Sequence, residues 1–99
     1  MGYFQVTSGE LRQNAEELNE LNKRFLLETE NLMNCQVELK NDWTGEANDS
    51  FNREFLKDKS HLDSFHNIVG QYVQSLLTIA DKYEEAENRN LSLAGSRTY

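Results

Sequence analysis

Residues 42–46 read Asp-Trp-Thr-Gly-Glu and lie near the middle of the 99-residue chain. Amphipathic, helix-like patterns lead up to this stretch and away from it. Gly45 permits a backbone geometry or a close approach that a Cβ atom would block. Thr44 can cap a helix that begins near Glu46, whose carboxylate suits the positive end of a helix dipole. A tight turn between two such segments predicts an antiparallel helical hairpin.

The first predicted helix covers residues 8–41. Thr7 and Glu10 fit a capping box at its start, in which each side chain satisfies a free backbone N–H of the other residue. After the cap, apolar residues recur every seven positions, the repeat of a left-handed coiled coil. They are Leu11, Leu18, Phe25, Leu32 and Leu39.

The second predicted helix covers residues 46–87 and carries the stronger periodicity. From Leu62 onward its apolar residues alternate gaps of three and four over more than three heptads. A second apolar line lies beside the first, so one stripe can pack on the first helix while the rest of the face needs another surface. Residues 88–99 lose the heptad pattern and are expected to form a flexible tail.

Two thin rods leave much of this seam in water, whereas two hairpins packed face to face close it into a four-helix bundle. The chain is thus expected to be one all-α domain, residues 1–99, that dimerises. Whether the partner is a second copy or a related chain stays open. The residues expected to form the core and dimer seam are Leu18, Phe25, Leu32, Phe55, Leu62, Phe65, Val69 and Leu76.

Charge and chemistry exclude several function classes. Ten basic against seventeen acidic residues give a net charge of −7, which disfavours nucleic acid and anionic lipid as partners. His61 and His66 are five residues apart, do not share a helix face and are expected at the surface rather than on a metal. With no catalytic pattern in the sequence, we expect no enzymatic activity, no cofactor and no small-molecule substrate.

Cys35 lies beside the apolar stripe of the first helix. It is expected to be a small buried hydrophobe. The alternative is a disulfide to a second chain, because a lone cysteine has no partner within its own chain.

Near the end of the second helix, Tyr83 and Glu87 are four residues apart and share a helix face. Each short feature is weak by itself, but their joint arrangement is specific. A chain near 100 residues, a central Trp43-Thr44-Gly45 turn between heptad helices and this Tyr-x-x-x-Glu pair resemble the WXG100 (ESAT-6-like) family. The resemblance covers about Ser8 to Glu87.

The resemblance implies a fold and a function. Members of that family form hairpins that dimerise head to tail and are exported by the type VII (ESX) secretion machinery, so the expected location is outside the cell. Tyr83 and Glu87 match the export signal that a membrane-bound FtsK/SpoIIIE-like ATPase receives. Trp43 and Gly45 match a turn that is thought to complete this signal from the partner chain. A free effector and a secretion partner of a larger protein are both compatible with this match.

Two other classes of function compete with export. An intracellular coiled-coil adaptor could hold a partner helix in the hairpin groove. A membrane-lytic protein is disfavoured by the acidic surface. The dependence of secretion on the ATPase discriminates export from the adaptor.

Overall fold

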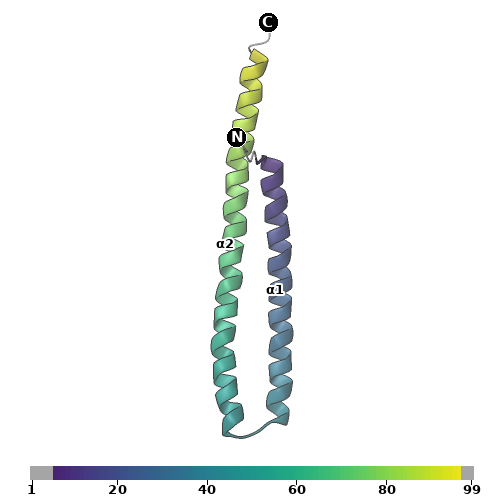
Figure 1. Ribbon diagram of the computed structural model, residues 1–99, viewed down its shortest axis with the longest axis vertical. Coiled ribbons are helices and arrows are strands. Elements are labelled where there is room, and N and C mark those ends of the chain that lie inside the picture. The colour runs from purple at the N-terminus through teal and green to yellow at the C-terminus, as the bar shows by residue number, and fades with distance from the viewer. Residues whose placement is uncertain (1–5, 97–99) are drawn as a thin grey trace, which may run out of the picture.

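Two long antiparallel helices make up the fold (Figure 1). The computed structural model of the protein describes residues 6–96, with side chains up to Leu93. Helix α1 spans Ser8–Asp42 and helix α2 spans Glu46–Ser96. The molecule is a rod with extents of 83 × 23 × 19 Å. The all-α hairpin expected from the sequence is confirmed.

The turn between the helices depends on a single glycine. Trp43 ends α1 in an extended conformation, with φ −128° and ψ 119°. Gly45 has φ +116°, a region that residues with a Cβ rarely adopt, and its carbonyl accepts the first helical hydrogen bond from Asp49 at 3.1 Å. The prediction that Thr44 caps α2 is therefore wrong. The sharp reversal at Gly45 lets the helix begin at Glu46, which puts Gly45 at the capping position.

Helix α2 continues well beyond the predicted end. It reaches Ser96, so the flexible tail expected from residue 88 is not found over residues 88–96. Residues 97–99 of that predicted tail lie outside the described residues. No proline interrupts the chain, and loss of the heptad removes a packing partner without breaking the helix. The last turns of α2 thus project past the start of α1 (Figure 1).

The line along which the helices touch is small and polar. On α1 the buried residues recur every seven positions: Ser8, Ala15, Asn22, Thr29 and Gln36. The facing line on α2 has the same spacing: Asn52, Lys59, His66, Val73, Ala80 and Glu87. Among the described residues, the buried hydrophobic side chains are Ala15, Val73 and Ala80. We call these two rows the contact line.

Hydrogen bonds across the contact line set the register of the hairpin. Asn22 Nδ2 donates to the His66 carbonyl at 3.0 Å, and Asn22 Oδ1 lies 3.0 Å from His66 Nδ1. Nearer the turn, Gln36 donates to Asn52, which donates to Asn48. His66 was expected at the surface. That expectation is wrong, because His66 is half-buried against α1.

The predicted seam lies beside the contact line and not on it. Seven of the eight seam residues follow a contact-line residue by three positions, as Phe25 follows Asn22, and Phe65 directly precedes His66. Leu32 and Phe65 are 47% and 53% exposed, and the other six seam residues are half-buried. They therefore do not form a core within one hairpin, and their role as a dimer seam stays a prediction. Cys35, expected to be buried, is exposed.

Candidate functional site

An apolar surface runs along one side of the hairpin and is the first candidate for a functional site. The Phe25 and Phe65 rings, whose centroids are 5.3 Å apart, join the stripes of α1 and α2 into one surface. We call this surface the apolar face. Its residues are Leu18, Phe25, Leu32 and Leu39 of α1 and Phe51, Phe55, Leu62, Phe65, Val69, Tyr72, Leu76, Ile79 and Tyr83 of α2. A rod-shaped molecule with such a face has a surface suited to another helical hairpin.

An aromatic cluster occupies the turn end of the apolar face. The Trp43 ring lies 5.8 Å from Phe51, and Phe51 lies 6.1 Å from Phe55. The face is hollowed here into an open groove whose lining includes Cys35 and Leu39. Trp43 is 36% exposed, so the indole is both packed and accessible from outside.

Tyr83 and Glu87 lie at the opposite end of the hairpin, where α1 begins. Tyr83 belongs to the apolar face and is 45% exposed. Glu87 lies one turn further along and is half-buried on the contact line. Within one chain, the structure therefore brings Tyr83 and Glu87 together but leaves Trp43 and Gly45 at the other end of the rod.

Glu87 is held by the first residue of α1. The Ser8 backbone N–H donates to Glu87 Oε1 at 3.0 Å, and the Ser8 hydroxyl donates to Glu87 Oε2 at 2.9 Å. These two hydrogen bonds, from the backbone first and the hydroxyl second, hold the pKa of the Glu87 carboxyl below its usual value. The sequence reasoning missed Ser8, although Ser8 lies seven residues before Ala15 and thus begins the α1 half of the contact line.

A second polar clamp closes the same end on the other side of the hairpin. Arg12 donates to Asp81 at 2.8 Å and also to Glu84. Both carboxylates raise the pKa of the guanidinium, which stays charged at every pH of interest. Arg12 therefore fastens α1 to α2 one turn away from Ser8, without contacting Glu87.

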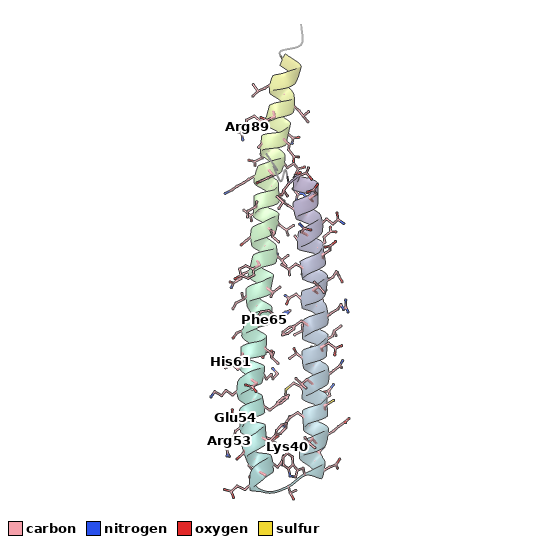
Figure 2. All side chains as sticks on the ribbon, viewed as in Figure 1. Lys40, Arg53, Glu54, His61, Phe65 and Arg89 are labelled. Atoms are coloured by element: carbon pink, nitrogen blue, oxygen red, sulfur yellow. The ribbon has the colours of Figure 1, made fainter. Side chains whose placement is uncertain are left out.

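Metal sites and membrane-spanning helices were also sought among the described residues. No group of three or more His, Cys, Asp or Glu side chains within the described part of the chain could hold a metal ion. Across residues 6–96, neither helix has a stretch that is long and apolar enough to span a lipid bilayer. Figure 2 shows Arg53, Glu54 and His61 on the outer side of α2, with Lys40 near the turn and Arg89 beyond the start of α1.

Comparisons with known proteins agree with the fold. No protein-family profile matches the sequence, and no curated protein matches it significantly. Among solved structures, the chain is similar to a selenomethionine-labelled secreted protein EsxB from Bacillus anthracis, with a TM-score of 0.77 and 22% identity over 88% of this chain and 99% of that one. Wild-type EsxB from the same organism gives a TM-score of 0.74 at 23% identity over 84% and 89%. The chain thus has the fold of the secreted EsxB proteins, and its resemblance to ESAT-6-like proteins is confirmed at the level of the fold.

Proposed function

We propose that this protein is a non-enzymatic substrate of a type VII secretion system, exported as a folded dimer that carries the address Tyr83-x-x-x-Glu87. The observation that carries the proposal is the arrangement of one end of the rod. There an exposed tyrosine and a fixed carboxylate lie side by side on adjacent turns of α2. The fold shared with proteins described as secreted supports it.

The shape of a single hairpin supports association. Its accessible surface is 7976 Å², whereas a compact monomer of 11.5 kDa exposes about 5,800 Å². Its radius of gyration is 22.7 Å, against about 13 Å for a compact chain of this length. A stable interface of ~800 Å² per chain would cover roughly a tenth of the surface, an area that the apolar face can supply.

The charges beside the apolar face favour a second copy in antiparallel orientation. Glu54, Ile68 and Lys82 are exposed and lie on one line of α2 at intervals of fourteen residues. A two-fold axis at Ile68, perpendicular to the helices, sets Glu54 opposite the partner's Lys82, and this contact occurs twice. Packing the turn ends together would instead bring Glu38 close to the partner's Glu54.

Exposed charge pairs contribute only about 0.2–1 kcal/mol each. The charges thus choose the orientation, and the apolar face supplies the affinity.

The antiparallel dimer also accounts for the distance between the two motifs. Tyr83 of one chain comes to lie beside the partner's Phe55, in the aromatic cluster that includes the partner's Trp43. Two complete addresses would then form, one at each end of the dimer, each from Tyr83 and Glu87 of one chain and the Trp-x-Gly turn of the other.

Secretion assays test the proposal. In a Gram-positive host carrying a type VII system, the protein is expected in the culture medium, and deletion of the secretion ATPase should abolish it. Tyr83→Ala should also abolish export. Tyr72→Ala is the matched control, because Tyr72 is an exposed tyrosine of the same face with Leu76, rather than a carboxylate, four residues later. Export of Tyr83→Ala at the level of Tyr72→Ala, or export without the ATPase, contradicts the proposal.

A further inference from the structure

The carboxylate of the proposed address is built from both helices. Ser8 is the first residue of α1, so its N–H has no acceptor within the helix. The Thr7 hydroxyl oxygen accepts from a different free donor, the Glu10 N–H at 3.1 Å, and leaves the Ser8 N–H unsatisfied. The carboxylate of Glu87, which lies 79 residues along the chain, accepts the hydrogen bond from this N–H. The positive end of the α1 dipole strengthens the contact.

We propose that Ser8 is a positioning residue of the export address, so that the address has its readable form only when α1 is docked on α2. The inference rests on the proposed function. A glutamate on an isolated helix samples many rotamers, and fixing such a side chain costs up to about 2 kcal/mol. Because Ser8 fixes the Glu87 side chain before the receptor binds, this entropy loss does not weaken binding to the receptor.

Positioning by Ser8 leaves the address open to a receptor. A carboxylate has about four acceptor sites, and Ser8 uses one on each oxygen, so each oxygen can still accept from a receptor donor. In the single hairpin Tyr83, one turn earlier, is 45% exposed. The contact therefore makes the address depend on the fold: a chain whose α1 is undocked carries the same two residues without their fixed geometry.

The sharpest test replaces Ser8 by proline. Proline is well tolerated at the first position of a helix, and the preceding Thr7 already has the extended conformation that proline requires, with φ −93° and ψ 160°. Ser8→Pro thus removes both donors to Glu87 while keeping the start of α1. The expected result is at least a tenfold drop in export, and a carboxyl pKa for Glu87, followed by NMR, that returns toward its usual value.

Arg12→Ala is the matched control for stability. It loosens the same end of the hairpin by removing the clamp to Asp81, but it leaves both Glu87 donors in place. Its export should stay near that of the unmodified protein, even where its melting temperature falls as far as that of Ser8→Pro. Should Ser8→Pro not fold, Ser8→Ala removes one of the two donors and should give an intermediate loss of export.

The outcomes separate this inference from the proposed function. Export of folded Ser8→Pro at or above the unmodified level overturns the positioning role, and an above-normal level would mean that Ser8 masks Glu87 instead. An equal loss in Arg12→Ala also overturns it, since stability alone would then explain the effect. If Tyr83→Ala is exported normally as well, the proposed function itself fails. If Tyr83→Ala is blocked and Ser8→Pro is not, only the role of Ser8 fails.

Discussion

Gly45 forms the turn of the hairpin. Replacing it should lower the free energy of unfolding through backbone strain alone, with no contribution from side-chain packing. A Cβ atom at Gly45 would meet nothing within 4 Å, so the penalty of Gly45→Ala is backbone strain at φ +116°. We expect a loss of about 1–3 kcal/mol. Gly9→Ala is the control, because Gly9 is helical and a Cβ there would make only an ordinary contact with Thr7 at 3.8 Å. It should stabilise the protein by about 0.5–1 kcal/mol. Urea unfolding at fixed protein concentration measures both, and equal effects of the two variants would contradict the strain at Gly45.

Glu87 gives the hairpin a predictable dependence on pH. Its pKa is lowered in the folded state, so its contribution to stability is present above the unfolded-state pKa and is lost as the pH falls through the folded-state pKa. The stability difference between the native protein and Glu87→Gln should therefore be constant near neutral pH and shrink below about pH 4. Denaturant unfolding across this pH range checks it. The contacts of Arg12 with Asp81 and Glu84 weaken at low pH in both proteins and cancel in the comparison. A difference that is independent of pH would show that Ser8 does not bind the ionised carboxylate.

The contacts between Glu87 and Ser8 make Glu87→Ala unsuitable as a test of export. From sequence alone, Glu87→Ala looks like a probe of export that leaves stability almost untouched. The structure contradicts this expectation, because Glu87 is half-buried and caps α1 through Ser8. Tyr83→Ala and Ser8→Pro, each with its control, replace it.

At the scale of the helices, the polar residues of the contact line fix how α1 and α2 are aligned, but they stabilise the hairpin less than apolar residues would. Asn22 binds both the carbonyl and the ring of His66. Asn22→Leu leaves the half-buried ring nitrogen of His66 without this partner and should cost about 1–3 kcal/mol. Adding His66→Leu should recover this loss, since two apolar residues replace the polar pair, but pairing in a single register should suffer.

Two measurements check the prediction for the contact line. Thermal unfolding should place the double variant at or above the native protein and Asn22→Leu below both. Amide NMR spectra should show extra or broadened peaks only for the double variant. A single variant as stable as the native protein would mean that Asn22 and His66 contribute nothing to the hairpin.

The elements also show what sequence reasoning can reach. The turn at Gly45, the start of α1 after Thr7 and the start of α2 at Glu46 follow from local signals, because each depends on residues within one or two turns. The end of α2 was placed too early, because loss of the heptad was taken for the end of the helix. The contact line was missed because the strongest apolar repeat, as in Leu62 and Val69, was taken for the packing surface within the hairpin. The bond from Ser8 to Glu87 joins residues 79 apart, and no local pattern reveals it.

At the scale of the whole molecule, the contact line and the apolar face have different roles. The polar contact line holds α1 against α2, and the apolar face is left outside. A single hairpin is therefore expected to be marginally stable, with much of its hydrophobic stabilisation available only on association. We expect this arrangement to couple folding to pairing, so that under the proposed function a dimer is exported and not a lone chain.

The orientation of that dimer can be measured with one pair of labels. A spin label at Lys40→Cys, in a Cys35→Ser background, sits near the turn (Figure 2) on the side of the hairpin away from the apolar face. With a two-fold axis at Ile68, the two labels should be separated by roughly 55 Å along the bundle. If the turn ends packed together, they would lie within about 25 Å, the width of two helix layers with their side chains. Electron–electron double resonance distinguishes the two values.

In the proposed dimer Glu54 lies opposite the partner's Lys82, so Lys82→Glu should weaken the dimer and Lys82→Glu with Glu54→Lys should restore it. A short label distance, or a charge exchange that restores nothing, would contradict the antiparallel pair and with it the meeting of Tyr83 with the partner's Trp43.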